Sequence, residues 1–282
     1  MKDLPRRTLT AIIFGAIMLG GLLWNRISFS ILILIIQSGC LYEYLMLVRT
    51  LQNYPEKKKR LVLIVTIVLC SAVLIAMILE QSDTLSIIYA VLLIPVCFLL
   101  LAAELFYQSE TPLINGLLNV GAVIYISSPM IFFYSLADDR WLDSNSRIPK
   151  AIDIAIGVVL IIWTSDTFAY FTGSLTGKHK ILPAISPKKS WEGFFGGLIF
   201  ALITSWILSL YFTKLNLQQW MIVAVIIVVF GSIGDFFESM IKRQAGVKDS
   251  GNLLPGHGGF LDRFDALLFC LPFVTMYLLL SS

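Results

Sequence analysis

The sequence predicts an all-α protein that crosses a membrane several times, and three observations support this fold class. Hydrophobic residues make up 57% of the chain, charged residues only 14%, and the mean hydropathy is +0.84, far from the balance of a soluble globular domain. Apolar stretches of about 20 residues, the length needed to cross roughly 30 Å of hydrocarbon, recur along the whole chain. Lipid offers backbone groups no hydrogen-bond partner, so each stretch is expected to be helical.

Nine spans are expected. They cover residues 8–24, 27–48, 61–79, 85–106, 113–136, 151–171, 191–212, 217–240 and 264–280. The first span follows the basic residues Lys2, Arg6 and Arg7 but lacks a small-residue cleavage site, which favours a retained helix over a signal peptide. The four cysteines lie inside spans without pairing or metal spacing, so they are expected to be small buried hydrophobes.

The distribution of Lys and Arg predicts the orientation, because cytoplasmic loops accumulate positive charge. With the N-terminus inside and the C-terminus outside, 16 of the 21 basic residues face the cytoplasm. The five outside are Arg26, Arg140, Arg147, Lys150 and Lys214. This arrangement also places the two chemically rich loops, residues 172–190 and 241–263, on the cytoplasmic face, where their positive charge favours an anionic partner.

Carboxylates gather around the second of these loops. Asp262 and Asp265 are three residues apart at the start of the last span, so a helix presents them on one face, where a cation between them would relieve their repulsion. Asp235, Glu238, Ser239 and Lys242 are expected to share a face of the preceding span. Oxygen ligands of this kind suit Mg²⁺, which completes its shell with phosphate oxygens and water. The alternative is a structural ion-pair cluster of Asp235 and Glu238 with Lys242 and Arg243.

Each of the two loops has a functional and a plain interpretation. The glycine-rich run 251–259 offers free backbone N–H groups, as phosphate cradles do, but glycines also mark ordinary tight turns. The basic clusters 177–180 and 186–193 suit anionic ligands, but such clusters also set topology or bind lipid headgroups. Asp166 favours the functional interpretation, because an acid inside a span needs a cation, a metal ion or a water-filled cavity.

The run 239–265 resembles the signature of the phosphatidate cytidylyltransferases, also called CDP-diacylglycerol synthases. It contains in order Ser239, Lys242-Arg243, Lys248-Asp249-Ser250-Gly251, Pro255-Gly256-His257-Gly258-Gly259 and Asp262-Arg263-Phe264-Asp265. The resemblance extends upstream through residues 232–239, 186–193 and 177–180 to Asp166 with Tyr170, whereas residues 1–150 resemble the family only in being hydrophobic spans. Ser190 stands where family members often have threonine, a change that keeps the hydroxyl.

The resemblance implies a multi-pass enzyme of phospholipid biosynthesis in the cell membrane that joins CTP to phosphatidic acid, releases pyrophosphate and leaves CDP-diacylglycerol. Membrane lipid and a second copy of the chain are the implied partners, and no nucleic acid is expected. Residues 1–150 would be a transmembrane scaffold of about five helices, and residues 151–282 the catalytic region with two cytoplasmic loops. Two anions must meet in this reaction, so positioning and charge neutralisation would carry the catalysis.

The resemblance also assigns roles to residues. Metal ligands for Mg²⁺, as one ion or two, would be Asp235, Asp262 and Asp265. Catalytic roles would fall to Asp166, Lys248, Asp249, His257 and Asp265. Substrate would be bound by Lys188, Lys189, Ser239, Lys242, Arg243, Gly258, Gly259 and Arg263.

Two other functions explain part of the pattern. A CTP-dependent lipid or polyprenol kinase would share the membrane, the nucleotide and the metal, but it would match the 239–265 signature less well. An ion or proton transporter would explain Asp166, Asp235 and Glu238. It would leave the glycine-rich loop unexplained, and transport acids usually lie nearer the bilayer midplane.

Overall fold

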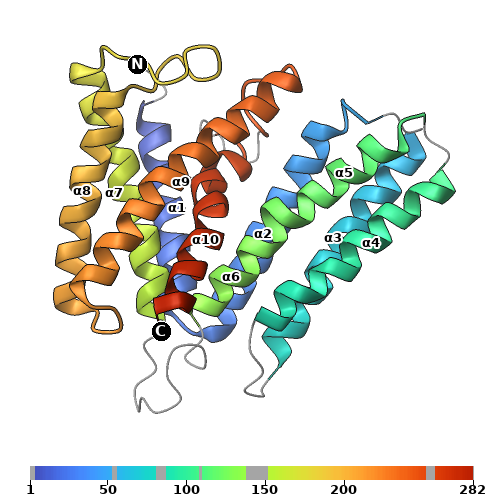
Figure 1. The fold of residues 1–282 in the computed structure, drawn as a ribbon, viewed down its shortest axis with the longest axis horizontal. Coiled ribbons are helices and arrows are strands. Elements are labelled where there is room, and N and C mark those ends of the chain that lie inside the picture. Colours follow the sequence, from blue (N-terminus) through green and yellow to red (C-terminus); the bar gives the residue numbers. More distant parts are fainter. Residues whose placement is uncertain are drawn as a thin grey trace. The chain divides into compact units, whose positions relative to one another are not determined.

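The structure is a computed structural model that describes residues 4–52, 56–80, 87–107, 110–137, 152–251 and 258–281. Within these ranges the elements are helices joined by loops, and an antiparallel bridge links Lys180 and Ser190 in the loop between residues 176 and 191 (Figure 1). The predicted all-α fold is confirmed. The positions around Asp143 and His257 lie outside the described residues.

The helices follow the predicted spans closely. They are α1 (Leu4–Leu23), α2 (Arg26–Val48), α3 (Glu56–Leu79), α4 (Ile87–Tyr107), α5 (Pro112–Ala122), the π-helical turn η1 (Val123–Ser127), α6 (Ser128–Leu136), α7 (Ile152–Thr176), α8 (Trp191–Tyr211), α9 (Leu217–Gln244) and α10 (Leu261–Ser281). In the described part of the chain eight helical segments are long and apolar enough to cross a membrane, with α5, η1 and α6 forming one of them. The first predicted span corresponds to α1.

Local sequence explains where α2 begins. Asn25 adopts an extended backbone, and its Oδ1 accepts a hydrogen bond from the backbone N–H of Ser28 at 2.8 Å. In return, Ser28 Oγ accepts from the backbone N–H of Asn25 at 3.0 Å. This reciprocal cap satisfies two N–H groups that a helix start leaves without partners, and it separates α2 from α1.

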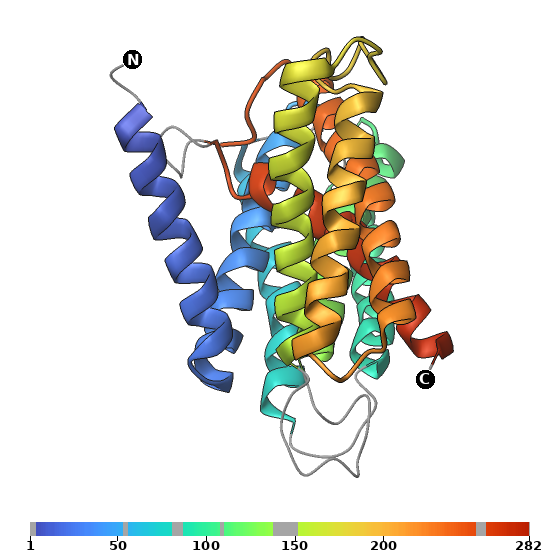
Figure 2. The same cartoon turned by 90° about the vertical axis from the view of Figure 1, so that its left-hand side faces the viewer.

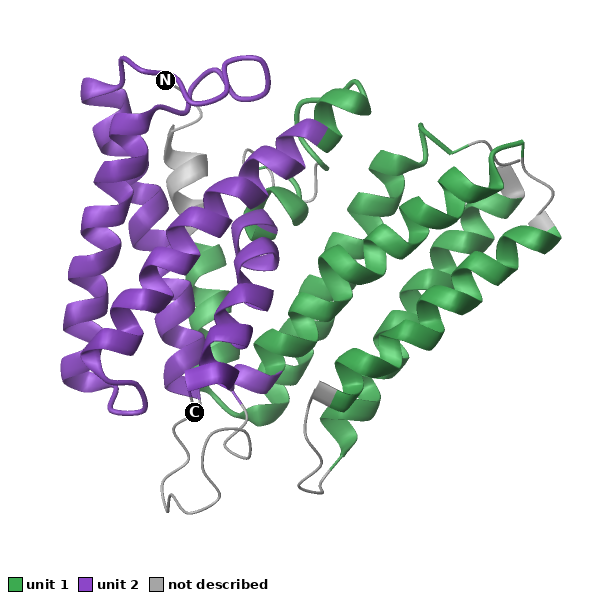
Figure 3. Cartoon of the chain, viewed as in Figure 1, with its two compact units in different colours: residues 1–134, 241–264 green, residues 135–240, 265–282 purple. Residues whose placement is uncertain are grey.

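The chain divides into two compact units, coloured separately in Figure 3. Unit 1 contains residues 1–134 and 241–264, and unit 2 contains residues 135–240 and 265–282. The end of α9 and the start of α10 therefore share a compact unit with the first half of the chain. The functional division into residues 1–150 and 151–282 stays a prediction.

Unit 2 is built on close contact between helices with small residues. α7 and α8 lie side by side in both ribbon views (Figure 2). A side chain at Gly196 of α8 would collide with Thr172 of α7, and Phe168 stacks on Phe200 with 3.5 Å between ring centroids. Small residues allow helix backbones to approach closely in membranes, where van der Waals packing drives association. In the same unit Phe230 of α9 stacks on Phe273 of α10 at 3.6 Å.

Unit 1 packs α1 to α5 as sequential neighbours around a buried core. Phe29 of α2 lies against Phe133 and Tyr134 of α6, with ring centroids 5.8 and 5.6 Å apart. A buried polar chain joins the loop after α2 to α5, because Gln52 Nε2 donates to Asn119 Oδ1 at 2.9 Å. Polar groups inside a membrane helix bundle need such partners.

Candidate active site

A polar pocket lies in unit 2. Its volume is about 620 Å³, within the range of small-molecule sites. Helices α7, α8 and α9 and the loop between α7 and α8 supply its walls. The polar side chains that line it are Ser165, Asp166, Tyr170, Ser174, Lys180, Lys188, Lys189, Ser190, Ser232 and Asp235. Asp166 therefore lies where the sequence requires it, at a cavity.

The loop between α7 and α8 is held in a defined shape by its own backbone. The N–H of Ile181 donates to the carbonyl of Lys189 at 3.2 Å, and the N–H of Trp191 donates to the carbonyl of His179 at 2.9 Å. Ser190 then caps α8, because its Oγ accepts from the N–H of Gly193 at 3.2 Å. These hydrogen bonds fix both arms of the loop, and Lys188 and Lys189 line the pocket.

Glu192 ties the outer part of this loop to α8. Its Oε1 lies 2.6 Å from Nδ1 of His179, and both carboxylate oxygens lie 3.2 Å from the backbone nitrogen of His179. His179, to which the sequence assigns no separate role, holds the loop against the start of α8.

Lys189 and Asp235 form an ion pair across the pocket. About a third of each side chain is exposed, at 30% for Lys189 and 33% for Asp235, so a ligand in the pocket can reach both. The ammonium group also lies 4.9 Å from the ring centroid of Phe236, a favourable position for a cation. Asp235 thus pairs with a lysine of the loop between α7 and α8. The alternative cluster of Asp235 and Glu238 with Lys242 and Arg243 stays a prediction.

Further acids of unit 2 lie near this ion pair. Asp265 of α10 is buried and interacts electrostatically with Asp235, Glu238 and Lys189. The two helices meet closely here, since a side chain at Gly234 of α9 would collide with Phe269 and would lie 2.6 Å from the carbonyl oxygen of Asp265. Within the described ranges, no three Asp, Glu, His or Cys side chains are grouped closely enough to hold a metal ion by themselves.

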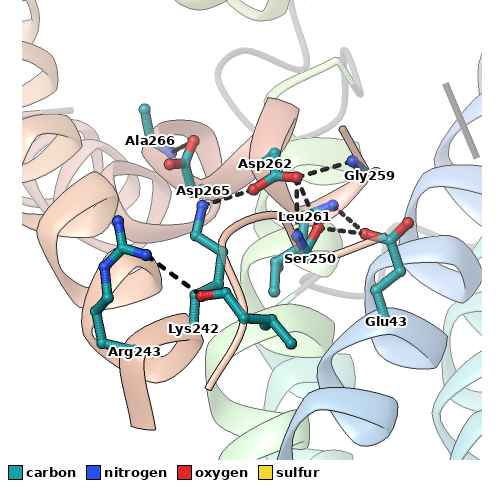
Figure 4. A network of polar contacts seen from close by, with 10 residues as sticks. Glu43, Lys242, Arg243, Ser250, Gly259, Leu261, Asp262, Asp265 and Ala266 are labelled. Atoms are coloured by element: carbon teal, nitrogen blue, oxygen red, sulfur yellow. Dashed lines mark hydrogen bonds and ion pairs between the residues drawn. The ribbon is translucent and has the colours of Figure 1, made fainter. Parts of the chain in front are cut away.

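Asp262 lies in unit 1, at the centre of the hydrogen bonds that close the glycine-rich loop (Figure 4). Its Oδ1 accepts from Lys242 Nζ at 2.6 Å. Its Oδ2 accepts from the backbone N–H groups of Ser250 at 3.0 Å and Gly259 at 2.8 Å, and lies 3.1 Å from Ser250 Oγ. Both oxygens of this nearly buried carboxylate therefore hold the protein's own groups in place.

Gly258 and Gly259 of this loop are needed for close packing. Gly258 has φ +81°, a conformation that side chains disfavour, and a Cβ there would collide with Asp262. A Cβ at Gly259 would collide with Ser250 and Glu43. The N–H of Gly259, expected from the sequence to approach a phosphate, donates to Asp262 in this structure.

The predicted site residues thus form two groups. Unit 2 holds Asp166, Lys188, Lys189, Asp235, Ser239 and Asp265, and unit 1 holds Lys242, Arg243, Lys248, Asp249, Gly258, Gly259, Asp262 and Arg263. In unit 1 the side chains of Arg243, Lys248, Asp249 and Arg263 are exposed.

Sequence reasoning missed two residues that the structure brings to these groups. Lys180 lines the pocket, and Glu43 of α2 contacts the glycine-rich loop. For Lys180 the basic run 177–180 was the available signal. For Glu43 the signal was an acid inside a hydrophobic span, which is costly unless it has a function.

The fold and the pocket define a class: a multi-pass membrane protein whose pocket combines lysines and aspartates, as a site for an anionic ligand would. The chain belongs to the Cytidylyltransferase family, whose profile matches residues 5–281. It is 35% identical over 277 residues to the phosphatidate cytidylyltransferase of Staphylococcus haemolyticus (strain JCSC1435), covering 97% of this chain and 98% of that protein. It is also 37% identical over 191 residues to the phosphatidate cytidylyltransferase of Staphylococcus aureus (strain COL), covering 67% and 69%.

Proposed function

We propose that this protein is a phosphatidate cytidylyltransferase, which makes CDP-diacylglycerol and pyrophosphate from CTP and phosphatidic acid. The observation that carries the proposal is the pocket of unit 2, which Lys180, Lys188 and Lys189 line together with Asp166 and Asp235, in a chain of the Cytidylyltransferase family. Its volume and its cationic lining suit the triphosphate of a nucleotide.

The reaction brings two anions together. A phosphate oxygen of phosphatidic acid forms a bond to the α-phosphorus of CTP, the bond from that phosphorus to the oxygen bridging to the β-phosphorus breaks, and pyrophosphate leaves with the electron pair. The pocket lysines lower the electrostatic cost of this approach, because fixed cations in a cavity act more strongly than ions in water. The anchored loop between α7 and α8 holds Lys188 and Lys189 before the substrate arrives, so little reorganisation is needed.

The donor set fits a hard divalent cation such as Mg²⁺. Asp235 and Asp265 are carboxylates of neighbouring helices within electrostatic range of each other, and such a pair favours a cation. Mg²⁺ commonly takes one or two protein carboxylates and completes its shell with substrate phosphates and water. We assign Mg²⁺ to Asp235 and Asp265; when bound, it would neutralise phosphate charge. Asp262, whose two oxygens accept from Lys242, Ser250 and Gly259 in this structure, stays a ligand that the family resemblance implies.

The proposal includes the setting of the enzyme. The site would face the cytoplasm, from which CTP is supplied, while phosphatidic acid would enter from the cell membrane. A homodimer is expected from the family resemblance. These statements rest on the distribution of basic residues and on the family.

The position of the transferred phosphorus tests the proposed reaction. Purified protein supplied with phosphatidic acid, Mg²⁺ and CTP labelled at the α-phosphorus should form a labelled liponucleotide, whereas label at the γ-phosphorus should appear only in pyrophosphate. Leaving out phosphatidic acid or the divalent cation should stop the formation of both the labelled liponucleotide and the labelled pyrophosphate. Transfer of γ-label into lipid would establish a kinase instead, and the absence of CTP turnover with any lipid would favour a transporter.

A further inference from the structure

Glu43 is a buried carboxylate in a part of the chain where the sequence shows no signature. It lies in α2 with 2% of its surface exposed. Its Oε2 accepts a hydrogen bond from Ser250 Oγ at 2.7 Å and another from the backbone N–H of Leu261 at 2.9 Å. Ser250 and Leu261 stand on either side of the glycine-rich loop, so one carboxylate oxygen binds both ends of that loop (Figure 4).

The described residues at both ends of the loop pack against this carboxylate. A Cβ at Gly251 would collide with Oε1 of Glu43, and a Cβ at Gly259 would collide with Oε2. The ring of Phe260, the residue after Gly259, packs against Gly39 of α2, because a Cβ at Gly39 would lie 2.9 Å from that ring. These three glycines are therefore explained by contact between the loop and α2.

Stability alone does not explain a carboxylate at this position. Removing a carboxylate from water costs several kcal/mol unless hydrogen bonds satisfy it. Glu43 Oε1 is buried and has no hydrogen-bond donor among the described atoms. A residue retained at such a cost usually has a function.

The contacts of Glu43 lead directly to Asp262. Ser250 Oγ lies 2.7 Å from Glu43 Oε2 and 3.1 Å from Asp262 Oδ2, and the backbone N–H of the same serine donates to Asp262. The backbone N–H of Gly259, which packs on Glu43, donates to Asp262 as well. Any movement of the loop away from Glu43 would therefore withdraw donors from Asp262.

We propose that Glu43 is a positioning residue: it fastens both ends of the glycine-rich loop to α2 and so fixes the orientation of Asp262. The proposal rests on the proposed function, in which Asp262 is part of the cytidylyltransferase site. Glu43 itself contacts no reacting atom. The N-terminal half of the chain thereby contributes a specific side chain to the site region and is more than a membrane scaffold.

Three variants and one control test this role. Glu43→Ala removes both hydrogen bonds, Glu43→Gln keeps one oxygen that can accept them, and Ser250→Ala breaks the same contact from the loop. Glu104→Gln is the matched control, because Glu104 is another buried carboxylate of unit 1 and accepts from Asn119 Nδ2 at 3.4 Å. Each purified protein is compared by amide hydrogen exchange of peptides covering residues 248–263 and by kcat and KM for CTP.

We expect Glu43→Ala and Ser250→Ala to raise exchange in residues 258–263 and to leave exchange in α7 and α8 unchanged. Their kcat should fall by about 10- to 100-fold, the usual effect of losing a group that orients a site residue, with less change in KM for CTP. Glu43→Gln should keep exchange of residues 258–263 and kcat much closer to the wild-type values than Glu43→Ala does. Glu104→Gln should resemble the wild type in both measurements. Adding Ser250→Ala to Glu43→Ala should change exchange and kcat little further, because both substitutions break the same contact between Ser250 and Glu43.

Normal exchange of residues 258–263 in Glu43→Ala, or a normal kcat, would overturn the proposal. If Glu43→Ala does not fold, Ser250→Ala decides by the same two criteria. The exchange measurement needs no turnover, so it tests the loop contact even if the wild type forms no liponucleotide; that result would refute the proposed function. If Glu43→Ala raises the exchange of residues 258–263 but the wild type makes no CDP-diacylglycerol, the contact between Glu43 and the loop is real and its catalytic role is refuted.

Discussion

Asp235 is the residue at which the proposed chemistry can be tested with least damage to the fold. Its ion pair with Lys189 is partly exposed on both sides, and pairs of this kind contribute little to stability, typically up to about 1 kcal/mol. Its carboxylate is also a proposed Mg²⁺ ligand. Removing the charge should therefore affect catalysis much more than folding.

We expect Asp235→Asn to lower kcat/KM by about 100-fold or more, equivalent to about 2.7 kcal/mol of transition-state stabilisation, and to raise the Mg²⁺ concentration needed for half-maximal rate. The thermal unfolding midpoint should change little. Asp153→Asn is the matched control, because Asp153 belongs to the same unit but lies in the first turn of α7 and does not line the pocket. Near-normal activity of Asp235→Asn at limiting Mg²⁺ would show that this carboxylate is not a metal ligand.

At the scale of the element, α7 and α8 pack closely through glycines of α8 beside the pocket. Gly193, Gly196 and Gly197 of α8 face α7, and a Cβ at Gly193 would lie 2.8 Å from the carbonyl oxygen of Ala169. The pocket is lined by both helices and by the loop that joins them. Added volume between the two helices should therefore disturb the site as well as the packing.

Gly196→Ala should lower the unfolding midpoint, because its Cβ would collide with Thr172, and overpacking of this kind costs roughly 1–3 kcal/mol. Gly20→Ala offers a control in a helix where nothing lies within 4 Å of the added Cβ. That control should be neutral, or slightly stabilising because alanine favours a helix over glycine. Thermal unfolding in the same detergent checks both; equal midpoints would mean that the α7–α8 contact tolerates a methyl group.

At the scale of the whole molecule, the basic residues predict which face of the membrane each loop occupies. The loops around Lys180 and Lys248 should face the cytoplasm and the loop around Asp143 the outside, because only this orientation gives the 16 to 5 division of Lys and Arg. Single cysteines at these three positions of a cysteine-free variant should react with an impermeant thiol reagent in intact cells only at position 143. Strong labelling at position 180 or 248 would reverse the orientation.

The sequence determined the fold class and most of the spans by itself. Eight predicted spans correspond to helices long and apolar enough for a membrane, because the requirement to satisfy every backbone group in lipid leaves a long apolar stretch no other structure. It also indicated the family, since the residues of the signature stand close together in the chain. Asp166 was predicted to need a cation or a cavity from the cost of a charge in lipid, and it lines the pocket.

Only the tertiary structure decided which side chains serve each other. Asp235 pairs with Lys189, 46 residues away, and Glu43 binds Ser250, 207 residues away, and neither contact has a periodicity or a spacing that marks it. The same holds for the glycines of the signature, which read as a phosphate cradle until Glu43 and Asp262 are seen packed against them. Helical spans follow from local composition, whereas these partners are set by how helices and loops pack, and so they appear only once the chain is folded.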